Sequence, residues 1–86
     1  MNSKTDEILI PVKVKEGMFP SEYSVHLKLA NGKHVSFFVD KQLIKKENGS
    51  SLLRAILVKE QGGNRYEVLL PEEPFETATR WAEVEL

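Results

Sequence analysis

Cysteine is absent from this chain of 86 residues, which excludes a disulfide framework, a thiolate zinc site and thiol redox chemistry. No apolar run approaches the roughly 18 residues that a membrane-spanning helix requires. The N-terminus is polar where a secretory signal would become apolar, so we expect cytoplasmic residence and disorder over residues 1–6. No linker or repeat divides the sequence, and we expect one domain over residues 1–86.

Neither sign of charge dominates the chain, whose formal net charge is −1. The two signs are nevertheless separated along the sequence. Up to Lys59, ten Lys and Arg residues stand against six Asp and Glu, whereas from Glu60 onward seven Glu stand against two Arg. A basic body with an acidic end is found in anion-binding surfaces, in self-masking proteins and, most often, in ordinary solvated surface.

Two alternating strands flank an Asn-Gly pair and predict a β-hairpin. A three-residue turn places Leu27 opposite Val35 and Val25 opposite Phe37, so the apolar side chains share one face. A two-residue turn would divide them between both faces. The longer turn also places Gly32 at a left-handed position, where a residue without Cβ costs least. We therefore predict the three-residue turn, with strands over about 22–30 and 33–40.

Further strands are predicted on both sides of this hairpin. In residues 8–15 every second position is Ile or Val, alternating with Leu9, Pro11, Lys13 and Lys15, and the proline favours an edge position or a bulge. Residues 52–58 are apolar on both faces, which predicts a central strand covered on both sides. This strand pairs with residues 65–70 in a register that places Glu60 opposite Arg65.

Two segments fit more than one structure. Residues 40–49 begin with an acidic cap and end at glycine, which predicts one or two helical turns or a continued strand ending near Ile44. Residues 75–86 have both helical and strand spacing, and we favour an irregular turn followed by a short strand from Arg80. Five or six short strands joined by tight turns are typical of a small barrel. We predict an all-β, antiparallel, SH3-like or OB-like barrel with at most one short helix.

Catalytic and metal-binding patterns are weak. The obvious bases are His26 and His34, both on the predicted polar face of the hairpin, and Lys28 opposite His34 supplies no orienting carboxylate. As metal ligands the two histidines lack the further partners that a zinc site needs. We expect no catalytic residue, no metal and no cofactor.

Apolar side chains outside the predicted core indicate an interaction surface. Met18 and Phe19 lie at a loop tip, Phe38 lies on the outer face of the hairpin, and Trp81 lies near the C-terminus. Leftover apolar surface marks interfaces, and Phe and Met are enriched at their centres. We expect a non-enzymatic interaction or accessory module of a cytoplasmic complex, bound to a protein partner or to a second copy. The C-terminal segment with Phe75 and Trp81 is an alternative cover for Phe38.

A nucleic-acid-binding protein is the alternative function. If the first strand lies beside the hairpin, several cations surround one aromatic ring on a common face: Lys13, Lys15, His26, Lys28, His34 and Phe38. Small barrels bind single strands by combining base stacking with neutralisation of the backbone. One phenylalanine is a small stacking platform, however, and the acidic C-terminal third repels phosphate.

Overall fold

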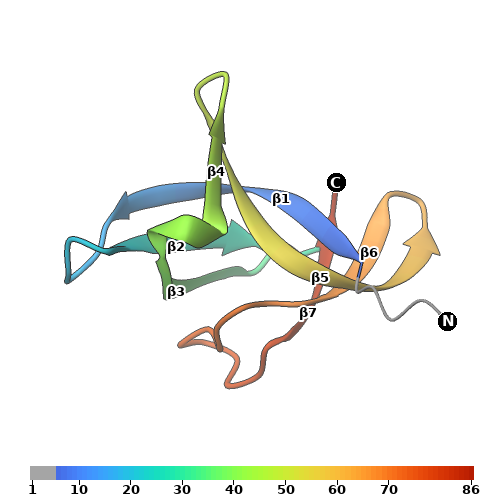
Figure 1. The fold of residues 1–86 in the computed structure, drawn as a ribbon. Helices are drawn as coiled ribbons and strands as arrows, with labels where there is room; N and C mark the ends of the chain where they lie inside the picture. Colours follow the sequence, from blue (N-terminus) through green and yellow to red (C-terminus); the bar gives the residue numbers. More distant parts are fainter. Residues whose placement is uncertain (1–5) are drawn as a thin grey trace, which may run out of the picture.

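The computed structural model describes residues 6–86. They form an antiparallel sheet that is curled into a half-barrel (Figure 1). Its strands are β1 (Glu7–Glu16), β2 (Glu22–Lys28), β3 (His34–Asp40), β4 (Ile44–Glu47), β5 (Ser50–Gly62), β6 (Arg65–Leu69) and β7 (Trp81–Glu85). Neighbours follow the order β3-β2-β1-β5-β6-β7, and β4 pairs with the start of β5. The prediction of a small all-β domain with one short helical turn is confirmed.

The β2–β3 hairpin has the predicted register. Leu27 pairs with Val35 and Val25 with Phe37. The Leu29 N–H donates to the Lys33 carbonyl at 2.8 Å, which closes a three-residue turn, and Gly32 has a φ of 90°. The inward positions of this hairpin and of the other strands form an entirely apolar core: Ile10, Val25, Leu27, Val35, Phe37, Val39, Ile44, Leu53, Ala55, Val68, Leu70, Ala82 and Val84. One-residue slippage would expel this set from the interior, which is why the pattern specifies the register.

Strand β1 passes from one neighbour to the other along its length. Residues 7–12 pair with β5, whereas residues 13–16 pair with β2. The Leu57 N–H donates to the Asp6 carbonyl, so alternation along the strand directs even-numbered backbone groups of β1 toward β5. Pro11 is odd-numbered and lies before the ladder to β2 begins, so its missing N–H removes no sheet hydrogen bond. The strand is locally an edge at Pro11, as the sequence required.

Other predictions need correction. Strand β5 is not covered on both sides, because Ile56 and Val58 are 37% and 42% exposed on the outside of the half-barrel. Glu60 does not face Arg65: two register shifts place Glu60 opposite Tyr66 and Gly62 opposite Arg65. Both errors have one source, since a curled one-layer sheet leaves its convex face open and accommodates its curvature through bulges.

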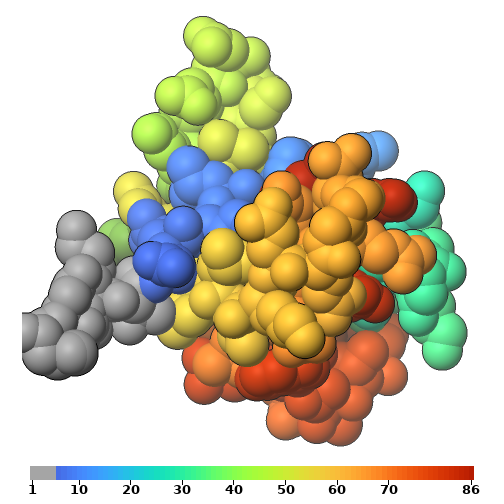
Figure 2. All heavy atoms as spheres, turned by 90° about the vertical axis from the view of Figure 1, so that its right-hand side faces the viewer, coloured from blue at the N-terminus to red at the C-terminus, as the bar shows by residue number. Residues whose placement is uncertain are grey.

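The two segments that fitted more than one structure, residues 40–49 and 75–86, each combine an irregular or helical turn with a strand. The Asp40 side chain accepts from the Gln42 N–H at 2.8 Å and caps a 3-10 turn over Lys41–Leu43, after which β4 begins at Ile44. The β4–β5 hairpin rises above the body of the domain (Figures 1 and 2). The C-terminal part is an irregular segment followed by β7, as favoured from sequence. Of the predicted disordered residues, 1–5 lie outside the described chain.

Candidate functional site

The outer face of β1, β2 and β3 carries a group of cations in cross-strand rows. Lys13 lies opposite His26, which in turn lies opposite Ser36. On one side of this row, Lys28 lies opposite His34. On the other side, Ser24 of β2 lies opposite both Lys15 of β1 and Phe38 of β3. The structure therefore brings the predicted nucleic-acid residues onto one surface.

Two adjoining hollows run across this surface. One, of about 430 Å³, is lined by Pro11, Val12, Lys13, His26, Lys28 and His34. The other, of about 720 Å³, shares four of these residues and continues past Lys15 to Lys46 and the Gly49–Ser51 turn of the β4–β5 hairpin. The second hollow exists because β1 leaves β5 after Val12 to join β2. Neither lining, drawn from residues 6–86, includes a carboxylate. We call the lysines and histidines that line the two hollows the basic face: Lys13, Lys15, His26, Lys28, His34 and Lys46.

The four lysines of the basic face are not neutralised by ion pairs within the described chain. The ion pairs there use other cations, namely Lys41 with Glu16, Lys45 with Glu47, Arg54 with Glu7 and Arg65 with Glu83. Lys46 instead lies 5.0 Å from the centre of the Tyr23 ring. Uncompensated lysines around a hollow concentrate positive potential there, because low-dielectric walls focus the field.

A second aromatic ring joins Phe38 at the margin of the basic face. Phe75, from the irregular segment after β6, packs edge-to-face against Phe38 with ring centroids 5.7 Å apart. Phe75 nevertheless stays 69% exposed, so the pair presents an open aromatic surface. The sequence named Phe75 only as a cover for Phe38. Periodicity in the sequence could not place Phe75 beside the lysines, because its segment is held by hydrogen bonds to a strand about 40 residues earlier in the chain.

Glu76, from the irregular segment after β6, is fixed against the outer face of β3 by two hydrogen bonds from Ser36. The Ser36 N–H donates to its Oε1 at 2.7 Å, and the Ser36 hydroxyl donates to its Oε2 at 2.8 Å. These two bonds, first the N–H and then the hydroxyl, lower the pKa of Glu76 below its ordinary value, with a smaller contribution from the charge of His26.

The protein-interaction candidates lie in separate surroundings. Met18 and Phe19 form the β1–β2 loop tip and are 74% and 63% exposed. This loop is held by hydrogen bonds from the Gly17 N–H to the Glu22 carbonyl and from the Glu22 N–H to the Phe19 carbonyl, both 3.1 Å. Trp81 lies instead on the outside of β7, opposite Leu69 of β6.

Three of the seven glutamates of the C-terminal third lie on β6 and β7, at the end of the sheet order away from β3. Glu67 lies opposite Glu83, and Glu85 lies opposite Arg65, all on the outer side of β6 and β7. In Figure 2, the β5–β6 hairpin faces the viewer and the segment after β6 forms a lobe beneath it. The charge asymmetry of the sequence therefore appears in part on the surface, whereas Glu76 lies against β3 on the outer face that carries the lysines.

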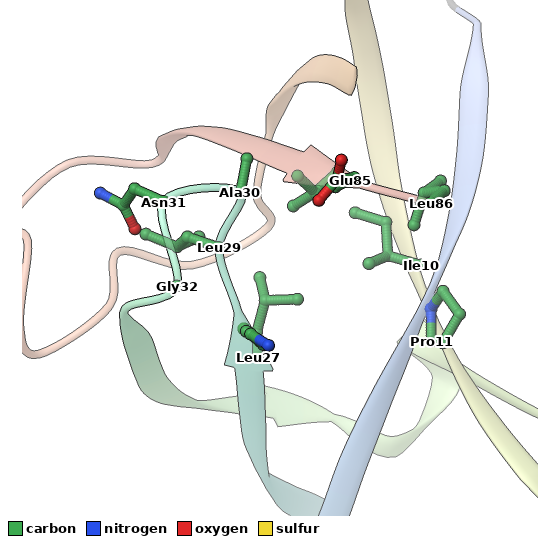
Figure 3. A pocket seen from close by; sticks show the side chains of 11 residues that line it. Ile10, Pro11, Leu27, Leu29, Ala30, Asn31, Gly32, Glu85 and Leu86 are labelled. Atoms are coloured by element: carbon green, nitrogen blue, oxygen red, sulfur yellow. The ribbon is translucent and has the colours of Figure 1, made fainter. Parts of the chain in front are cut away.

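A further hollow of about 560 Å³ opens at one mouth of the half-barrel, between β1, the β2–β3 turn and the end of β7. Figure 3 shows Ile10, Leu27 and Leu29 around it. The Ala30 N–H closes part of this mouth by donating to the Glu83 carbonyl at 2.8 Å. Its lining brings together no set of acid, base and nucleophile that could catalyse a reaction.

The two histidines named from the sequence do not meet further metal ligands in the described residues. His26 and His34 are exposed, and no three His, Asp or Glu side chains converge on a possible metal position within residues 6–86. The same residues contain no helix long and apolar enough to cross a membrane. No protein-family model, curated protein or solved structure matches this chain.

Proposed function

We propose that this domain binds single-stranded nucleic acid through the basic face and has no catalytic activity. The observation that supports it most strongly is a continuous pair of hollows whose four lysines have no carboxylate partner in the described chain. Lysines in such a groove neutralise backbone phosphates irrespective of base sequence.

The aromatic pair favours single strands over other polyanions. Phe38 and Phe75 lie at the margin of the basic face, and Phe75 exposes most of its ring. Every unpaired base has a flat face that can stack on such a ring, whereas the bases of a duplex are already stacked. A simple polyanion such as heparin would gain nothing from the rings.

The test is fluorescence anisotropy with a labelled oligo(dT) strand and the matching duplex. We expect the single strand to bind more tightly, and Phe75→Ala to weaken its binding at least about fivefold, since stacking contributes about 1–3 kcal/mol per base. Phe19→Ala is the matched control, because that ring is similarly exposed but lies on the β1–β2 loop. Equal effects of both variants, or tighter binding of the duplex, would contradict stacking on Phe75.

A protein partner at the β1–β2 loop is a second candidate. Its support is the exposure of Met18 and Phe19 on a loop that internal hydrogen bonds already hold in place. A preorganised loop loses little conformational entropy when it docks. Replacement of both residues by serine should abolish capture of such a partner and leave oligo(dT) binding unchanged. A capture that survives this double substitution refutes the loop as the docking element.

A further inference from the structure

Ser36 carries an exposed pair of hydrogen-bond donors at the free edge of β3. This strand is the last in the sheet order, so the Ser36 N–H points away from the ladder to β2. Its hydroxyl points to the same acceptor, and the Ser36 carbonyl accepts from the Phe75 N–H at 3.0 Å. All the bonds that attach the 74–76 segment to β3 therefore meet at one residue.

The group held by this pair is an anion with two oxygens side by side. Each oxygen of Glu76 accepts one bond, from the N–H at 2.7 Å and from the hydroxyl at 2.8 Å, and the short N–H bond is characteristic of an ionised acceptor. Two non-bridging oxygens of a phosphodiester present the same arrangement. Glu76 is exposed to solvent, so water can replace its bonds and its carboxylate can leave at small cost.

The donor pair lies in line with the cations of the basic face. Ser36 is opposite His26, and His26 is opposite Lys13, so the three lie on adjacent strands about 4.8 Å apart. His26 makes a small contribution to the lowered pKa of Glu76, as expected for a carboxylate held on the neighbouring strand. When one phosphate of a strand binds Lys13 and His26, the next phosphate of that strand lies close to Ser36.

We propose that the N–H and hydroxyl of Ser36 form a phosphate-binding subsite at the edge of the basic face, occupied by the Glu76 carboxylate in the free domain. A ligand phosphate replaces that carboxylate when the Glu76 side chain turns toward solvent. The inference rests on the proposed function for the identity of the ligand, and it adds an internal competitor that limits affinity.

Binding of labelled oligo(dT) to three variants tests the subsite. Glu76→Ala should tighten binding about tenfold at low salt, because it frees two donors and removes a competing charge. Glu73→Ala, which removes an equal charge from the same irregular segment, should change the affinity less than about twofold. Ser36→Ala added to Glu76→Ala should cancel about half of the gain. Equal effects of Glu76→Ala and Glu73→Ala, or an unchanged gain in the double variant, would overturn the subsite.

A titration with inorganic phosphate separates this inference from the proposed function. The amide resonance of Ser36 should shift with phosphate in Glu76→Ala and much less in the unaltered domain. If oligo(dT) binds none of the proteins while this shift occurs, the nucleic-acid function fails and the subsite stands. If oligo(dT) binds but Ser36 does not respond in either protein, the subsite fails and the function stands. Should Glu76→Ala lose its fold, Glu76→Gln keeps one acceptor oxygen and should show a smaller shift of the same kind.

Discussion

Neutralising one lysine of the basic face should reduce the salt dependence of oligo(dT) binding by a defined amount. Each lysine that neutralises a phosphate of a single strand contributes about −0.7 to the slope of log K against log salt. The four lysines without carboxylate partners, Lys13, Lys15, Lys28 and Lys46, therefore predict a slope of about −2.8. Raising salt from about 50 to about 200 mM should then weaken binding about 50-fold.

Lys13 is the lysine to change first, because it lines both hollows. In Lys13→Gln the slope should fall to about −2.1, and the same rise in salt should weaken binding only about 18-fold. Anisotropy titrations at four or five salt concentrations measure both slopes. The side chain is exposed, so loss of its charge should leave the fold unchanged.

Lys59→Gln is the matched control for this measurement. It removes the same charge from an exposed position of β5, opposite Glu67 and away from both hollows. Its slope should equal that of the unaltered domain. If Lys13→Gln and Lys59→Gln lower the slope equally, net charge governs binding and the basic face is not the site. A slope near zero in the unaltered domain would show that binding involves no phosphate contacts.

Three further predictions concern the fold and its pH dependence. Phe37→Ala should cost about 3–5 kcal/mol in urea unfolding, because the ring is 1% exposed at the centre of the core; a loss below about 1 kcal/mol would contradict that packing. Gly32→Ala should cost about 1–2 kcal/mol, because a Cβ disfavours the φ of 90° at the turn; an unchanged melting temperature would refute this turn. The lowered pKa of Glu76 means that its bonds to Ser36 stabilise the fold above pH 4.5 and that this stability is lost as pH falls through the lowered value. Melting temperatures between about pH 6 and about pH 3 should therefore fall less steeply in Glu76→Gln, and parallel curves would contradict it.

Local pattern was sufficient to predict the parts of the fold in which neighbours in sequence are neighbours in space. The β2–β3 register followed from alternation and from the place of Gly32, and the interruption at Pro11 correctly indicated a local edge. The same alternation placed the cations of three strands on one face once β1 was known to pair with β2. Coverage of β5 was predicted wrongly, since an apolar run does not reveal whether a second layer exists to cover it.

The position of the segment after β6 could not be predicted from the sequence for a different reason. Helical and strand spacing overlap in residues 75–86, and neither pattern shows where the segment packs, because contacts with Ser36 and Phe38, some 40 residues earlier, hold it in place. Such contacts leave no mark in either partner's local sequence. The sequence did suggest Phe75 as a cover for Phe38, and that contact is confirmed, but the Glu76–Ser36 bonds are visible only in the folded domain.

A formal charge of −1 does not argue against binding of a polyanion by this domain. In about 0.1 M salt, charges are screened beyond about 10 Å, whereas the domain measures 37 × 32 × 27 Å. A phosphate in the hollows therefore responds mainly to the lysines that line them, and no glutamate of β6 or β7 lines either hollow. Glu76 differs from those glutamates because Ser36 holds it on the same outer face as the cations. Of the carboxylates in the acidic third, it is the one whose removal should change affinity by more than the loss of one distant charge.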